Sequence, residues 1–250
     1  MFHRRAHLSK ILGTLALTLL VGSFLLVSTV QSESSSNRNA QLPPIAGDLL
    51  RGRTVIIDPG HGGWDPGARG KNVIEATINL EVALKLRTWL KMAGARVLMT
   101  WNHPRAIPAT RKYRVYERSH WINAQHADVL IDIHCNSGPA AFKNPQTFFW
   151  EGSASFHLAH DVQEELQFFT HSHRDVKRIN QYVLKHAHIP AINVEIGYVT
   201  NPHEERLLMT SAYQDELTWY IFVGMERWLV KGRWPPGMLD APPPTDLLVR

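Results

Sequence analysis

Residues 54–63 have the sequence TVIIDPGHGG, in which an apolar, β-branched run stops at a loop rich in glycine. Such a run, bounded by a turn signal, is typical of a strand that is buried on both faces of a sheet. Asp58-Pro59-Gly60 marks the turn at which this strand ends. The other strands that the sequence predicts are Arg96–Thr100, Asp128–His134, Thr147–Trp150 and Ala191–Ile196.

Helical patterns separate these strands. In residues 75–93 the apolar positions recur at helical spacing and form one stripe, made of Ile78, Val82, Leu86, Trp89 and Ala93. Gly94 follows as a stop signal. The other predicted helices are Tyr113–Gln125, Ser155–Phe169, a helix that begins at Pro202, and a helix from Ser211 to about Val230.

Two of these helices have recognisable start signals. Asn201 is expected to be an N-cap, with Pro202 at the first helical position. Ser211 and Gln214 have the spacing of a capping box. Strands that alternate with long helices predict an α/β fold with a single domain. We expect a mostly parallel (mixed) central sheet with helices on both faces, of a phosphorylase/hydrolase-like kind.

Composition narrows the class of protein. Of the 250 residues, 44% are hydrophobic and 20% are charged, which fits a globular chain and excludes wholesale disorder. The one cysteine excludes an internal disulfide and a cysteine-rich zinc module. The formal net charge is +5, but no dense Lys/Arg run interleaves with aromatic residues. Nucleic acid is therefore not an expected partner.

The N-terminal residues predict a membrane anchor or a signal peptide. Ile11–Val30 is a run of 20 residues without a charge, long enough to span a bilayer as a helix, and basic residues precede it. A cleaved signal peptide is the alternative, with Val30-Gln31-Ser32 as a passable cleavage site. The predicted organisation is an anchor or signal over residues 1–32, a linker over 33–48, a catalytic domain over 49–231 and a proline-rich tail over 232–250.

Polar side chains stand where the predicted strands end. His61 follows the first strand, His134 ends the third, and Glu195 lies on a later one, while Glu75 opens the first helix. Sites in α/β folds lie at the carboxyl ends of strands. Two histidines and a carboxylate from distant parts of a chain form a zinc-type ligand set that leaves a position open for water. Iron and manganese accept the same ligand types.

Side chains alternate between the two faces of a strand, so the residues next to His134 and Glu195 can be assigned to one face or the other. If His134 faces the site, Cys135 faces away into the packing, and Asp132 shares the face of His134 as a supporting acceptor. Glu195 shares a face with Asn193, opposite Val194. A glutamate on an apolar strand is costly to bury unless it is paired. It is therefore either a salt-bridged structural residue or a general base beside the metal.

Longer segments carry a family resemblance over about residues 53–230. The sequence resembles the zinc-dependent N-acetylmuramoyl-L-alanine amidases of the amidase-3 type, and within them the CwlD-type germination-specific amidases of endospore formers. The segments that carry the resemblance are DPGHGG (58–63), Glu75, LEVALKLRTWLKMAGARVLMT (80–100), E-R-x-x-x-I-N (117–123), I-H-x-N-S (133–137) and VEIGYVTNPHEERLL (194–208).

The resemblance implies a function for particular residues. It makes His61, Glu75 and His134 the ligands of one Zn²⁺ per chain, and it makes Glu195 the catalytic glutamate. The implied substrate is peptidoglycan, in particular spore cortex, where removal of the stem peptide is the first step toward muramic-δ-lactam. An accessory protein is a possible partner of unknown identity.

Two other functions compete with the amidase. The first is a zinc carboxypeptidase acting on wall peptides, which needs an arginine to bind the terminal carboxylate of its substrate. Arg118 is the candidate for that role. The second is a non-catalytic wall-binding protein, which an intact set of two histidines and two glutamates argues against.

The basic residues Arg4, Arg5 and Lys10 before Ile11–Val30 predict that the catalytic domain lies outside the cytoplasmic membrane. A reporter fused after Arg250 should therefore be active only if it is of a kind that works outside the cytoplasm. Activity of a reporter that works only in the cytoplasm, fused at the same position, would reverse the topology.

Overall fold

The computed structural model describes residues 48–104 and 115–230. The predicted anchor or signal over 1–32, the linker up to residue 47 and the tail over 232–250 lie outside the described residues. Among the residues that are described, no helix is both long and apolar enough to cross a bilayer.

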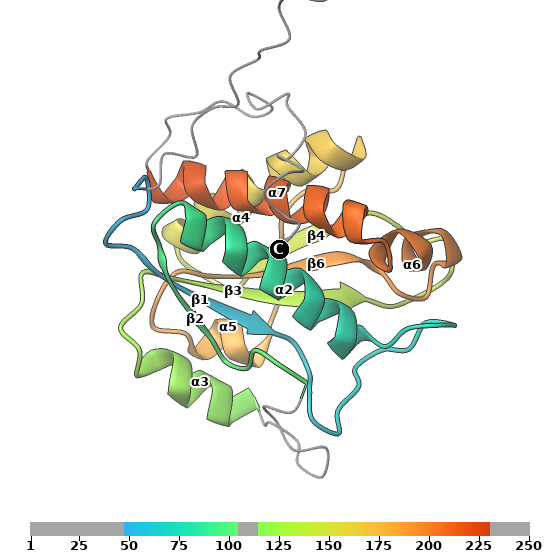
Figure 1. Cartoon of the computed structure of the whole chain (residues 1–250), viewed down its shortest axis with the longest axis horizontal. Coiled ribbons are helices and arrows are strands. Elements are labelled where there is room, and N and C mark those ends of the chain that lie inside the picture. Colours follow the sequence, from blue (N-terminus) through green and yellow to red (C-terminus); the bar gives the residue numbers. More distant parts are fainter. Residues whose placement is uncertain (1–47, 105–114, 231–250) are drawn as a thin grey trace, which may run out of the picture. The chain divides into compact units, whose positions relative to one another are not determined.

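A six-stranded sheet forms the centre of the described chain (Figure 1). The strand order is β2-β1-β3-β6-β4-β5. Strands β2, β1, β3 and β6 are parallel, β4 runs antiparallel to β6, and β5 is parallel to β4. The predicted mostly parallel, mixed sheet is therefore confirmed. The strand bounds are β1 Thr54–Pro59, β2 Arg96–Met99, β3 Val129–Asn136, β4 Gln146–Phe149, β5 Lys177–Arg178 and β6 Ala191–Tyr198.

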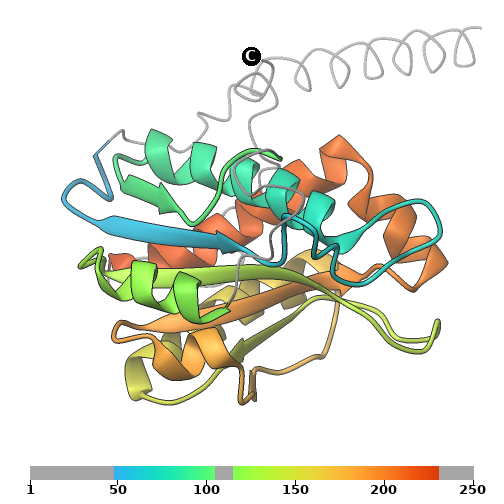
Figure 2. The same cartoon turned by 90° about the horizontal axis from the view of Figure 1, so that it is seen from below.

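Helices cover both faces of the sheet, as predicted. The bounds are α2 Glu75–Met92, α3 Val115–Asn123, α4 Ser153–Thr170, α5 Tyr182–His186, α6 Pro202–Leu208 and α7 Ser211–Leu229. Val55 and Ile57 of β1 belong to a buried cluster with α2, α4 and α7, whereas Ile56 belongs to a second cluster with α3 and α5. In the view from below, α3 and α5 lie in front of the strands (Figure 2). Alternate residues of one strand thus face different helix layers.

The first helix forms as the sequence predicts. Every residue of its apolar stripe, from Ile78 to Ala93, is at most 1% exposed. Gly94 follows with φ +90°, a left-handed conformation that glycine adopts without steric cost, and the chain turns there into β2. Trp89 packs edge-on against Trp219 of α7 at 4.9 Å between ring centroids. This stripe joins α2 to the sheet and to α7.

One predicted helix start is confirmed and the other is wrong. The Asn201 side chain accepts hydrogen bonds from the backbone N–H groups of His203 and Glu204, as an N-cap does. Ser211 is not an N-cap, because Thr210 occupies that position without a side-chain cap bond. The Gln214 side chain instead donates to the Leu208 carbonyl at 2.7 Å. The expected capping box is replaced by a contact between α7 and the end of α6.

Close packing of α4 on α7 depends on a glycine and an arginine. A Cβ atom on Gly224 would lie 2.5 Å from Cα of Val162, so only glycine lets the two helices approach this closely. Nearby, the Arg227 guanidinium pairs with Glu165 at 3.2 Å, and also with Asp161 and Glu164. Arg227 is 4% exposed and Glu165 only 1%. Their charges are therefore compensated inside the helix interface.

Replacing Arg227 by Met should remove this compensation, because the buried Glu165 carboxylate loses the guanidinium that lies 3.2 Å away. Breaking a buried ion pair from one side costs about 3–5 kcal/mol. We expect the free energy of unfolding, measured by urea denaturation, to fall by that amount. The matched control is Arg51→Met, since the Arg51–Asp48 pair is exposed and should contribute less than about 1 kcal/mol. Equal losses in the two variants would contradict the role assigned to Arg227.

Candidate metal centre and active site

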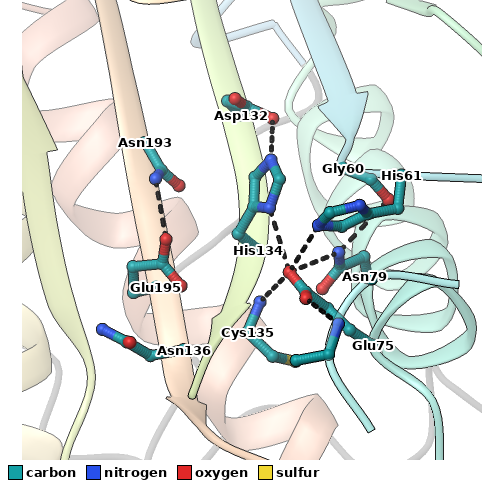
Figure 3. A network of polar contacts seen from close by, with 12 residues as sticks. Gly60, His61, Glu75, Asn79, Asp132, His134, Cys135, Asn136, Asn193 and Glu195 are labelled. Carbon is teal, nitrogen blue, oxygen red and sulfur yellow. Dashed lines mark hydrogen bonds and ion pairs between the residues drawn. The ribbon is translucent and has the colours of Figure 1, made fainter. Parts of the chain in front are cut away.

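Three side chains that are distant in the sequence meet at the carboxyl ends of the strands (Figure 3). His61 comes from the loop after β1, Glu75 is the first residue of α2, and His134 lies near the end of β3. Oε1 of Glu75 lies 3.2 Å from Nε2 of His61 and 3.0 Å from Nδ1 of His134. One ligand atom from each residue lies within 4.8 Å of the other two, so the three can bind one metal ion.

Glycines let the loop approach these side chains. The backbone of Gly60 crosses the ring of His134 so closely that a Cβ atom there would lie 2.2 Å from Cε1 of the ring. Gly67, at φ +67°, is also close to the site, since a Cβ atom there would lie 2.6 Å from Oε2 of Glu75. Gly60 of the DPGHGG sequence, and Gly67 after it, are therefore needed for the close approach of backbone to side chains, and not only for a turn.

Glu75 is buried and is surrounded by donors. The backbone N–H of Ala68 donates to Oε2 at 2.7 Å, and that of Cys135 donates to Oε1 at 3.1 Å. Burial alone would raise the pKa of Glu75, but hydrogen bonds from His134 and His61 outweigh burial and lower the pKa. The carboxylate is thus kept as an anion, which is the form that binds a metal.

The second nitrogen of each histidine faces a carboxylate. Nδ1 of His61 lies 3.3 Å from Oδ1 of Asp65, and Nε2 of His134 lies 3.3 Å from Oδ1 of Asp132. Asp132 in turn accepts a hydrogen bond from the Gln181 side chain at 2.8 Å. Metal-binding histidines commonly have such partners, which fix the ring and raise its basicity. The sequence pointed to Asp132 by strand alternation, but it offered no signal for Asp65 or Gln181.

Glu195 lies beside this set and is not part of it. It is paired in register with His134 across β3 and β6. Its Oε1 accepts a hydrogen bond from Asn193 at 3.0 Å, whereas its buried Oε2 has no hydrogen-bond partner among the described residues. Burial raises the pKa of Glu195, against the lowering effect of His134. A carboxylate with one unsatisfied oxygen and a raised pKa is suited to accept a proton.

Neighbouring candidates have other surroundings. Cys135 is 4% exposed and belongs to the main apolar cluster, so its thiol is packed in the core as strand alternation predicts.

Elsewhere in the described chain, His160, Asp161 and Glu164 also form a group with enough ligand atoms for a metal. Arg227 already pairs with both of those carboxylates.

Arg118 does not have the surroundings of a substrate-binding arginine. It is 3% exposed, and its guanidinium donates to the Asp58 carboxylate at 2.5 Å, to the Pro59 carbonyl at 2.7 Å and to the His61 carbonyl. A carboxypeptidase needs an arginine whose donors are available to the substrate. The predicted alternative role of Arg118 therefore lacks support. Its contact with the metal-site loop was not foreseen from the sequence.

Comparison with known proteins shows the family to which the chain is related. The profile of the family described as N-acetylmuramoyl-L-alanine amidase matches residues 55–227. The germination-specific N-acetylmuramoyl-L-alanine amidase of Bacillus subtilis (strain 168) is 32% identical over 199 residues, which is 75% of this chain and 84% of that protein.

Solved structures agree with the sequence match. The CwlD amidase of Clostridioides difficile, solved in complex with the GerS lipoprotein, has a TM-score of 0.67 and 30% identity, covering 71% of this chain and 98% of that chain. The catalytic domain of CwlV, an amidase from Bacillus (Paenibacillus) polymyxa var. colistinus, has a TM-score of 0.65 and 28% identity. The match covers 71% of this chain and 98% of that chain.

The family match spans more than half of the chain and includes His61, Glu75, His134 and Glu195. The chain therefore belongs to the N-acetylmuramoyl-L-alanine amidase family, the hydrolases that cleave the amide bond between N-acetylmuramic acid and L-alanine in peptidoglycan.

Proposed function

We propose that this amidase uses one zinc ion per chain, bound by His61, Glu75 and His134, and that Glu195 is its catalytic acid and base. The observation that carries the proposal is the convergence of three ligand atoms within 4.8 Å of one another at the edge of the sheet. Two imidazoles and one carboxylate match the three protein ligands of a catalytic zinc site. Carboxylate partners behind both imidazoles add to the fit.

Bound zinc would polarise the scissile carbonyl and would lower the pKa of the attacking water from about 15.7 toward about 7. The protein's own contribution is proton transfer. Glu195 takes a proton from the water on its unsatisfied Oε2 and passes it to the nitrogen of L-alanine as the amide bond breaks. That nitrogen then leaves as a neutral amine, which is a far better leaving group than an amide anion.

The proposed substrate is spore-cortex peptidoglycan. The support is the similarity to the germination-specific amidase of Bacillus subtilis and to the CwlD amidase. We place the catalytic domain at residues 49–231, outside the cytoplasm, attached through the membrane segment in 1–32 or released after its cleavage. The complex of the CwlD amidase with a lipoprotein supports an accessory protein as a further partner of this chain.

The metal proposal predicts which histidines matter. His61→Ala and His134→Ala each remove one of three protein ligands, so purified protein should lose its zinc on dialysis. His157→Ala is the matched control, because His157 is an exposed histidine on α4 and should leave the zinc content unchanged. Metal content is measured by inductively coupled plasma mass spectrometry, which also identifies bound iron or manganese. Full occupancy in both site variants would rule out this ligand set.

The second prediction separates chemistry from metal binding. Glu195→Gln keeps the length of the side chain and an oxygen that can accept from Asn193, but it cannot carry the proton. Loss of a general acid or base costs about 10²–10⁴ in rate. We expect zinc content near that of the wild type and a fall of that size in turnover. Turnover is measured by mass spectrometry of muropeptides released from cortex and from vegetative sacculi.

Glu151→Gln, on an exposed side chain, is the control and should leave both quantities unchanged. If Glu195→Gln loses zinc together with activity, Glu195 is a ligand and the role of Glu75 must be reconsidered. If it keeps both, the base lies elsewhere, and Asp132 becomes the next candidate. Equal release from vegetative and cortex sacculi would contradict the proposed preference for cortex.

A further inference from the structure

A buried arginine reaches from α3 to the loop that carries His61. Nη1 of Arg118 donates to the Asp58 carboxylate and to the Pro59 carbonyl, and Nη2 donates to the carbonyl of His61 itself. One guanidinium thus contacts three acceptors within four consecutive residues, which run from the end of β1 to His61 in the loop. The amidase mechanism proposed above assigns no role to this side chain.

The loop needs such support, because His61 has an unfavourable backbone conformation. Its φ is +63°, in the left-handed region that side chains with a Cβ atom rarely adopt. On its inner side the loop is already in tight contact with the site, since Gly60 lies against the ring of His134. A shift of the loop would therefore move the His61 imidazole relative to Glu75 and His134. The carbonyl of His61 is bound by Arg118.

The geometry of the contact is specific to arginine. Asp58 is 1% exposed, and the Thr100 hydroxyl also donates to its carboxylate. The planar guanidinium has several donors in a fixed fork, so it can bind the Asp58 carboxylate and the loop carbonyls together. A lysine has the same charge in a compact ammonium group on a flexible chain. It can pair with Asp58, but it cannot reproduce the same set of simultaneous contacts.

We propose that Arg118 is a positioning residue for the metal centre, which fixes the backbone of His61 so that its imidazole meets Glu75 and His134. The proposal rests on the zinc site proposed above. It differs from a role in substrate binding, although Arg118 lines a cavity of about 220 Å³ that also contacts His61 and His134.

The test compares Arg118→Lys and Arg118→Met with the matched control Arg227→Lys, which makes the same change at a buried arginine between α4 and α7. The zinc dissociation constant is measured by competition with a chelator. Unfolding of the metal-free protein, and KM and kcat at saturating zinc, are measured in parallel. Loss of a group that supports a metal ligand weakens affinity by about 10- to 100-fold. We expect that loss in Arg118→Lys, a larger loss in Arg118→Met, and wild-type affinity in Arg227→Lys.

At saturating zinc, Arg118→Lys should regain activity with an unchanged KM. Unchanged zinc affinity together with a raised KM would make Arg118 a substrate-binding residue and would overturn the proposal. Equal loss of zinc affinity in Arg118→Lys and Arg227→Lys would contradict the proposal, and so would failure of Arg118→Lys to fold. Either result would mean that Arg118 only stabilises the folded protein. Wild-type protein that binds no zinc would instead overturn the metal site itself, and this inference with it.

Discussion

The carboxylate of Glu75 is the contact on which the active end of the sheet depends. Its Oε1 lies within 3.2 Å of a nitrogen of His61 and of His134, and it accepts a hydrogen bond from the backbone of Cys135. A buried carboxylate is costly unless several donors surround it. Here those donors come from the β1 loop and from the end of β3. The first turn of α2, the glycine-rich loop and the third strand can therefore take up their positions only together.

Two glutamates in this small region have opposite electrostatic environments. Hydrogen bonds lower the pKa of Glu75, whereas burial raises the pKa of Glu195, one oxygen of which has no hydrogen-bond partner in the part of the chain that the structure describes. The difference follows from their positions in the fold. Glu75 opens a helix between two histidines, while Glu195 lies within a strand whose backbone groups are already paired. Neighbouring groups whose environments separate their pKa values are suited to different chemical tasks.

Most of the fold and the central residues of the site could be predicted from the sequence, because both depend on short-range patterns. Apolar runs marked the strands, and alternation along β3 placed Asp132 and Cys135 on opposite faces. The features that the sequence did not predict depend on tertiary contacts. β5 and α5 are too short to show a period, and Gln214 binds the end of α6 instead of closing a capping box. Burial of Arg118 is equally invisible, since α3 carries polar residues and an arginine is ordinarily expected at the surface.

The outermost strand beyond β4 has a consequence for aggregation. β5 consists only of Lys177 and Arg178, both exposed, and the guanidinium of Arg178 lies 4.5 Å from the centre of the Trp150 ring. A free edge of a sheet offers unpaired backbone groups on which a second chain can add a strand. A two-residue edge offers few such groups. Its Lys177 is an exposed charge of the kind that hinders strand addition, while Arg178 is paired with Glu151. Edge-to-edge association of neighbouring molecules through this end of the sheet is therefore disfavoured, even where many copies are crowded together.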